Sequence, residues 1–200
     1  VKMRNGTREQ RPPIVDSDDE LVDLIRRAAT RLGRAERRFD SASPELNLQL
    51  PDGSRLFAAM EVSLRPTLVI RKHQFSMSRL TELQLRGLCD PLTASFLAAA
   101  VRSKRNIIVC GGTGSGKTTL LRALINEVAP SERIVTIEDA YELGIDRFHD
   151  LHPDHDALQS RPANIEGHGE VTLADLTRMA LRMDPDRVIV GEVRGAEAFP

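Results

Sequence analysis

The residues Gly111-Gly112-Thr113-Gly114-Ser115-Gly116-Lys117-Thr118 match the phosphate-binding pattern G-x-x-x-x-G-K-[ST] at every fixed position. Glycines let a backbone take positive φ angles and aim successive N–H groups at phosphate oxygens. In such a loop the Lys117 amine can reach the β and γ phosphates, and the Thr118 hydroxyl can hold Mg²⁺. The pattern therefore predicts binding of a nucleoside triphosphate.

The flanks of this loop have the expected context. Asn106 to Cys110 is a short apolar run that predicts a buried strand closed by a packed Cys110 thiol. After the loop, apolar residues recur at helical spacing, at Leu120, Leu121, Ala123, Leu124 and Val128. A helix that begins at the loop would point its positive dipole end at the phosphates. This context disfavours a chance glycine-rich turn.

Two further apolar runs end in acids. Arg187 to Val190 is followed by Gly191 and Glu192, which has the form of a Walker B strand whose carboxylate lies near Mg²⁺. Arg133 to Ile137 is followed by the adjacent acids Glu138 and Asp139. One of these two acids could orient an attacking water, or both could be exposed residues at a strand end.

A segment rich in histidine and aspartate allows two interpretations. His149, His152 and His155 alternate with acids, which suggests metal ligands. Pro153 would break a helix that aligned them, and no cysteine lies nearby. We therefore expect a surface loop here in preference to a zinc site.

The composition of the chain limits the classes of partner and the cellular location that we expect for it. The chain has 200 residues, with 28 basic against 29 acidic side chains, so no global field indicates nucleic acid, and no direct nucleic-acid partner is predicted. The longest apolar run, near Ala94 to Val101, is too short to span a bilayer. We expect a soluble cytosolic protein, and the ends of the sequence suggest that it could be a fragment.

The predicted organisation is α/β. We expect a partial N-terminal α/β domain at 1–71, a linker at 72–80 and a nucleotide-binding domain at 81–200 with a mostly parallel sheet. Ser17 to Glu20 is expected to form a capping box before a helix that Gly33 would end. The remaining expected strands are 46–50, 55–62, 67–70, 133–137 and 187–190; the expected helices are 80–88, 92–104 and 172–183, and 141–168 is expected to be irregular.

With these elements in hand, the chain resembles the secretion ATPases of the type II/type IV traffic family, and most closely their CpaF-type branch of tight-adherence pilus assembly. The resemblance runs from about residue 45 to the end. The segments that support it are GGTGSGKTT (111–119), RIVTIEDAYEL (133–143), RPANIEGHGEV (161–171) and ALRMDPDRVIVGEVRG (180–195).

The resemblance implies a small N-terminal α/β domain joined to a RecA-like ATPase domain, with ATP and Mg²⁺ as ligands. It implies that Glu138 is the catalytic acid that orients water and that Glu192 is the Walker B acid. It also implies that Arg55 and Arg71 of the N-terminal domain reach the nucleotide. The nucleotide-binding set is then Gly111, Gly112, Thr113, Gly114, Ser115, Gly116, Lys117, Thr118, Thr119, Arg55 and Arg71; Glu138, Glu192 and Lys117 are catalytic, and Thr118 and Glu192 hold the metal.

The resemblance also implies a homo-oligomer, a hexameric ring, on the cytoplasmic face of the inner membrane, bound to a secretion or pilus platform protein. Two departures from the family pattern stand out. His168 occupies a position where arginine is usual, and the family's histidine box would follow Pro200. We therefore expect residues 1–200 alone to hydrolyse ATP weakly or not at all, because the sheet and the site would be incomplete at the C-terminus.

Alternatives from other classes stay open. The chain could be a regulatory or scaffold subunit that binds nucleotide without turnover, or, as a near variant, a conjugal-transfer ATPase. An ABC-type transporter ATPase is disfavoured because no L-S-G-G-Q signature separates the two Walker elements. A small-molecule kinase is disfavoured by the pair of Ile-Glu-Asp and Gly-Glu-Val-Arg-Gly.

Overall fold

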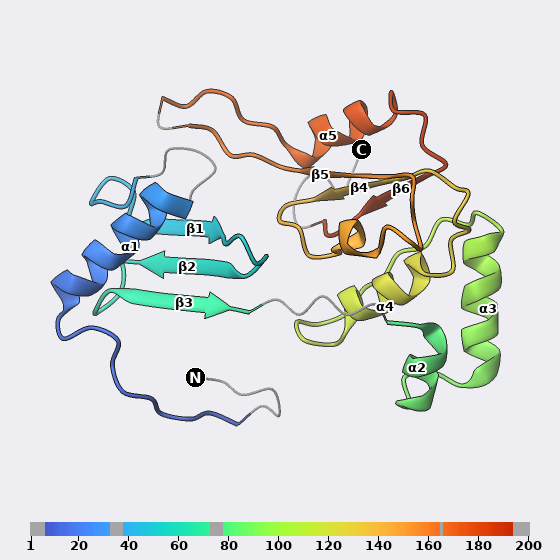
Figure 1. Ribbon diagram of the computed structural model, residues 1–200, viewed down its shortest axis with the longest axis horizontal. Helices are drawn as coiled ribbons and strands as arrows, with labels where there is room; N and C mark the ends of the chain where they lie inside the picture. Colours follow the sequence, from blue (N-terminus) through green and yellow to red (C-terminus); the bar gives the residue numbers. More distant parts are fainter. Residues whose placement is uncertain (1–6, 33–37, 73–77, 165, 194–200) are drawn as a thin grey trace. The chain divides into compact units, whose positions relative to one another are not determined.

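The computed structural model describes residues 7–32, 38–72, 78–164 and 166–193. The chain divides into two compact units, Val1–Lys72 and His73–Pro200 (Figure 1). The expected Gly33 helix stop lies outside the described residues, as does most of the expected linker.

The first unit is one helix packed on a three-stranded antiparallel sheet. Helix α1 (Asp18–Leu32) covers strands β1 (Glu45–Gln49), β2 (Arg55–Ala59) and β3 (Thr67–Arg71), which lie in the order β1-β2-β3. The Ser17 hydroxyl accepts the Glu20 N–H at 3.1 Å, which caps the first turn of α1. Alternate strand residues face the helix and form one core, with Ile25, Ala29, Leu46, Leu48, Leu56 and Ala58 at its centre.

A tight turn sets the register of this sheet. Gly53 takes φ +83°, which a glycine adopts without strain, and its N–H donates to the Leu50 carbonyl at 2.8 Å. The Asp52 carboxylate accepts the Ser54 N–H and hydroxyl, each at 2.9 Å. The resulting pairing places Arg55 directly opposite Arg71.

The second unit contains a parallel sheet between helices. Its elements are α2 (Leu80–Leu85), α3 (Pro91–Arg102), α4 (Lys117–Ile125), β4 (Ile134–Glu138), the 3-10 helix η1 (Ile145–Phe148), β5 (His155–Gln159), α5 (Leu173–Ala180) and β6 (Arg187–Val190). The described strands run parallel in the order β5-β4-β6. These findings confirm the α/β class and the mostly parallel sheet of this unit.

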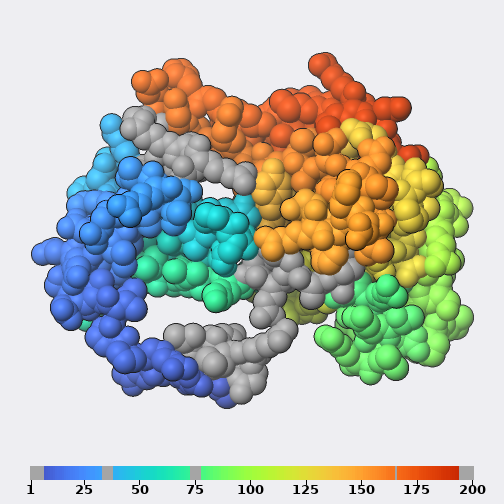
Figure 2. Space-filling view, in the orientation of Figure 1, coloured from blue at the N-terminus to red at the C-terminus, as the bar shows by residue number. Residues whose placement is uncertain are grey.

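Strand β4 is buried on both faces, and its side chains alternate between two cores. Ile134 packs with residues of α2, α3 and α4 in one core. Val135 and Ile137 pack with Leu176 and Ala180 of α5 in the other. By the same alternation, Thr136 and Glu138 lie on the α4 side of the sheet. Leu85 of α2 and Leu92 and Phe96 of α3 are exposed. Figure 2 shows the segment of these two helices in green at the surface.

Ion pairs join the elements at the amino ends of β4 and β6. Glu132 accepts two hydrogen bonds from the Arg187 guanidinium, at 2.7 and 3.2 Å, and both side chains are largely buried. Arg187 also donates to the Val101 carbonyl of α3 at 2.7 Å. Lys104 lies 3.3 Å from Glu132 and 2.8 Å from Asp186. The pairs fix α3 against the strand starts.

The expected buried strand before the phosphate loop is not formed. Residues 106–110 have no strand assignment, Ile108 is 92% exposed, and Cys110 is an exposed thiol instead of a packed one. An apolar run becomes a strand only when a neighbouring edge supplies ladder hydrogen bonds. Within the described residues, β6 pairs with β4 alone, and 106–110 does not join it.

The segment expected to be irregular contains a strand. His155–Gln159 pairs in register with all five residues of β4. The polar composition of this segment does not predict a strand. The segment is held in the sheet by its parallel pairing with the buried strand β4, and not by local propensity. The last expected helix is also shorter, because α5 ends at Ala180. Thr172 and Asp175 form a full capping box at its start.

Candidate functional site

The phosphate loop has the backbone that its glycines predict. Gly111, Gly114 and Gly116 take φ angles of +152°, +76° and +91°. Gly116 is the left-handed residue immediately before α4, so the helix begins at Lys117. A Cβ on Gly111 would lie 2.9 Å from the Ser115 hydroxyl oxygen, so the loop is also too tight for a side chain there. The conformation requires glycine at these positions.

Lys117 folds back over its own loop. Its ammonium donates to the Gly111 carbonyl at 2.9 Å and to the Gly112 carbonyl at 2.8 Å. An ammonium has three N–H donors, and these contacts use two of them. Thr118 and Thr119 follow, half-buried in the first turn of α4. Positive charge, helix N–H groups and hydroxyls thus meet at one helix end, an arrangement suited to phosphate oxygens.

Glu138, the last residue of β4, is buried on the α4 side of the sheet and only 2% exposed. Its Oε2 accepts the N–H groups of Glu142 and Leu143, both at 2.7 Å. Burial raises the pKa of Glu138 above its usual value, and the two N–H donors oppose that rise. The nearby Glu142 carboxylate raises this pKa further, and the Arg122 guanidinium lowers it.

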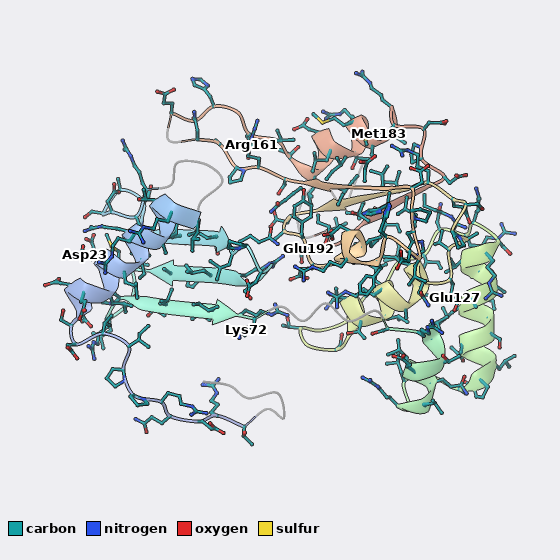
Figure 3. The ribbon with its side chains drawn as sticks, viewed as in Figure 1. Asp23, Lys72, Glu127, Arg161, Met183 and Glu192 are labelled. Carbon is teal, nitrogen blue, oxygen red and sulfur yellow. The ribbon has the colours of Figure 1, made fainter. Side chains whose placement is uncertain are left out.

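Strand β6 ends beside this acid. The Gly191 N–H donates to the Ile137 carbonyl at 2.8 Å. A Cβ on Gly191 would lie 3.0 Å from the Glu138 Cγ. Glu192 comes next and is half-buried at the carboxyl end of β6; Figure 3 shows it on the side of the unit opposite to Glu127. The structure therefore brings the ends of the two acid-bearing strands together, as the sequence pattern predicts.

Sequence reasoning missed Arg122. This arginine lies on α4, is 7% exposed, and donates from its guanidinium to the Glu142 carbonyl. Its neighbours Leu121, Ala123 and Leu124 belong to the core on this face. An arginine inside an apolar run of a helix is the signal that could have identified it, since buried arginines need partners.

Arg55 and Arg71 occupy facing positions on β2 and β3 of the first unit. Residues directly opposite in an antiparallel pair project from the same face of the sheet. Like charges at such a pair destabilise the sheet unless an anion or an acid compensates them. The first unit thus presents two arginines on one face.

The histidine segment is not the surface loop that we expected. His152 is 1% exposed, and neither ring nitrogen has a partner among the described residues. Burial and, secondarily, the neighbouring His155 lower the pKa of His152. The rings of His149 and His155 meet edge to face, with centroids 6.1 Å apart. No cluster of three metal-binding side chains occurs within the described ranges.

The described residues between 161 and 171 are mostly exposed. Arg161 and Val171 pair as an antiparallel bridge, and the Arg161 Nε donates to the Gly169 carbonyl at 2.8 Å. The Asn164 side chain accepts the N–H groups of Glu166 and His168, at 3.0 and 2.8 Å. His168 itself is exposed.

Comparison with known proteins adds family evidence. The chain is 42% identical over 206 residues to a Mycobacterium tuberculosis protein named for conjugal transfer, a match that covers 98% of this chain and 56% of the relative. It is 36% identical to the type IV secretion system protein PtlH of Bordetella pertussis, covering 98% of this chain and 62% of PtlH. The chain thus spans little more than half the length of these relatives.

This chain shares 31% sequence identity with a solved structure. That structure is the VirB11 ATPase of the Brucella suis type IV secretion system in complex with sulphate. The match covers 82% of this chain and 52% of that one, with a TM-score of 0.45.

In the part of the chain that the structure describes, no helix has both the length and the apolar character needed to cross a bilayer.

The family model described as type II/IV secretion system protein matches residues 9–199, nearly the whole chain. Together with the phosphate loop and the paired strand ends, this match shows that the chain belongs to the type II/IV secretion system protein family.

Proposed function

We propose that this chain is the ATP-binding and ATP-hydrolysing part of a motor subunit that powers secretion or pilus assembly. One observation supports this most: Lys117 starts α4 at the glycine loop, and the buried acid Glu138 lies on the face of the sheet that α4 covers. Phosphoryl transfer depends mainly on positioning and charge stabilisation, and these two groups supply both. In this proposal His73–Pro200 is the RecA-like unit.

The site residues have distinct roles in the proposal. The N–H groups of 111–119 and the Lys117 ammonium bind the phosphates of ATP. The Thr118 hydroxyl and the Glu192 carboxylate are oxygen donors, which suit Mg²⁺, and Mg²⁺ would supply charge neutralisation at the β and γ phosphates. Glu138 orients the attacking water. Arg55 and Arg71 add positive charge from the first unit.

The family and the relatives support a proposal about partners. PtlH and VirB11 are named as type IV secretion system proteins. We propose that the intact protein forms a homo-oligomeric ring, with six subunits in our expectation, at the cytoplasmic face of the inner membrane. Its partner there would be a platform protein of the secretion or pilus machine. The relative named for conjugal transfer supports a conjugal-transfer ATPase as a near variant of this proposal.

The proposal is tested by measuring ATP binding and turnover in the Lys117→Ala variant of the intact protein. Loss of the ammonium should abolish ATP binding or turnover and leave the fold unchanged by circular dichroism. Lys104→Ala is the matched control, because that lysine pairs with acids at the opposite end of the strands. Unchanged hydrolysis in the Lys117 variant would refute the proposal.

The variant Glu192→Gln distinguishes a motor subunit from a scaffold subunit. A motor loses turnover and its assembly function together, whereas a scaffold retains assembly. Secretion or pilus assembly in cells that carry this variant is the measurement.

A further inference from the structure

A buried arginine connects the phosphate-loop helix to the segment that holds Glu138. Arg122 lies five residues after Lys117 on α4, about 7.5 Å along the helix axis. It is 7% exposed within an otherwise apolar core. Burial lowers the pKa of Arg122, which measures the cost of placing the charge there. A charge kept at such a cost needs a compensating interaction.

One such interaction is with a peptide group after β4. The Arg122 guanidinium donates to the carbonyl of Glu142. The N–H of the same peptide, which belongs to Leu143, donates to the Glu138 Oε2 at 2.7 Å. In a trans peptide the C=O and N–H point in opposite directions, so Arg122 and Glu138 bind the two ends of one rigid plane. The preceding N–H, of Glu142, binds the same carboxylate oxygen at 2.7 Å.

The geometry has an electrostatic consequence. A guanidinium at the carbonyl polarises the peptide and makes its N–H a stronger donor to Glu138. The Arg122 charge also acts directly on the Glu138 and Glu142 carboxylates. These are the charged groups that face Arg122 from β4 and from the turn after it.

We propose that Arg122 is a positioning residue, which fixes the 142–143 peptide and through it the Glu138 carboxylate relative to the helix that begins at Lys117. The inference rests on the proposed function, since it gives Arg122 a role only if Glu138 orients the attacking water. Arg122 itself does not touch the substrate. Its effect is to hold the acid and the phosphate-binding lysine in one rigid frame.

The experiment compares Arg122→Met and Arg122→Lys in the intact protein. Methionine keeps much of the apolar volume and loses the charge and the donors. We expect kcat to fall by about 10²-fold, as for small misplacements of a reacting group, while ATP affinity changes less than twofold. Arg122→Lys, which retains a charged donor, should recover part of kcat. Arg102→Met is the control, because Arg102 is exposed and pairs with Glu127.

A pH profile adds a readout that a purely structural role would not move. Loss of the positive charge should raise the pKa of Glu138 further and shift the acidic limb of kcat to higher pH in Arg122→Met. If the methionine variant does not fold, Arg122→Gln, which is neutral but polar, is measured by the same criteria. A wild-type kcat in the folded neutral variant would overturn the inference. So would an equal loss of ATP affinity and kcat that lysine does not restore.

Glu138→Gln separates this inference from the proposed function. If Glu138→Gln retains full turnover, the role of Glu138 in the proposed function is wrong, and the inference fails with it. If Glu138→Gln is inactive and Arg122→Met is fully active, only the inference about Arg122 is wrong. If both lose kcat, the double variant should lose no more than Glu138→Gln alone, because the two residues act as one unit.

Discussion

Gly191 lies against Glu138 so closely that a β-carbon there would approach the Glu138 Cγ to 3.0 Å. Gly191 has no left-handed φ, so alanine strains no backbone and acts through this contact alone. We expect Gly191→Ala to displace the Glu138 carboxylate and reduce kcat by about 10-fold to 10²-fold, with ATP affinity retained. Steady-state kinetics and ATP binding of the intact protein are the measurements.

A double-variant cycle controls that result. If Gly191→Ala acts through Glu138, it should have little additional effect in a Glu138→Gln background. Wild-type kcat in Gly191→Ala alone would show that the Glu138 position tolerates the shift.

Arg55 and Arg71 give a second prediction, since they face each other across β2 and β3. Replacing either with methionine removes one member of a like-charge pair. If these side chains bind phosphate, ATP affinity should fall by about 10-fold or more. Isothermal titration with ATP checks both variants. Arg65→Met, which removes an exposed arginine paired with Asp18, is the control. Unchanged affinity in both variants would assign Arg55 and Arg71 another role.

The burial of His152 leads us to predict that the stability of the protein depends on pH. Its native pKa is lowered by burial, so below a pH of about 6.5 the unfolded chain binds a proton that the native state does not. The free energy of unfolding should therefore fall with decreasing pH, by up to about 1.4 kcal/mol per pH unit, until the native pKa is reached. Urea titrations between pH 7.5 and 5 measure it.

The variants for this test are His152→Leu and His168→Gln. The leucine variant should lose this part of the pH dependence, whatever its stability at pH 7.5. His168 is exposed, and His168→Gln serves as the control substitution. An unchanged slope in His152→Leu would show that another group causes it.

The Arg187–Glu132 pair gives a stability prediction at the other end of the strands. Both side chains are largely buried, and Arg187→Met removes the partner that donates two hydrogen bonds to Glu132. The substitution should therefore cost about 3 kcal/mol, although Lys104 still lies beside Glu132. The exposed pair of Arg178 and Asp175 is the matched control, and Arg178→Met should cost at most about 0.5 kcal/mol. Chemical denaturation distinguishes the two. Equal effects would mean that water screens the Arg187 pair as well.

Local sequence signals predicted the elements whose causes are local. The positive-φ glycines of the phosphate loop, the helix that starts at Lys117 and the strand at 187–190 each follow from residue type or spacing. In each case the preferred conformation of a few neighbouring residues agrees with the fold.

Elements whose causes lie elsewhere in the chain were not predictable in this way. His155–Gln159 is a strand because β4 pairs with it, while the more apolar 106–110 is not a strand because no described edge pairs with it. The contact of Arg122 with the Glu142 carbonyl depends on packing between α4 and the turn after β4. Propensity carries no information on such contacts.

The alternation of side chains along β4 places two neighbouring acids differently. Glu138 shares the α4 side with Thr136, whereas Asp139 has left the strand and accepts a hydrogen bond from the Ser160 hydroxyl at 2.6 Å. A slip of one residue in the pairing of β4 would exchange the two positions and present the shorter acid to the phosphate-loop helix. The position of an acid along the strand therefore determines which face of the sheet its side chain is on, and this position is why we propose Glu138 as the acid at the phosphates.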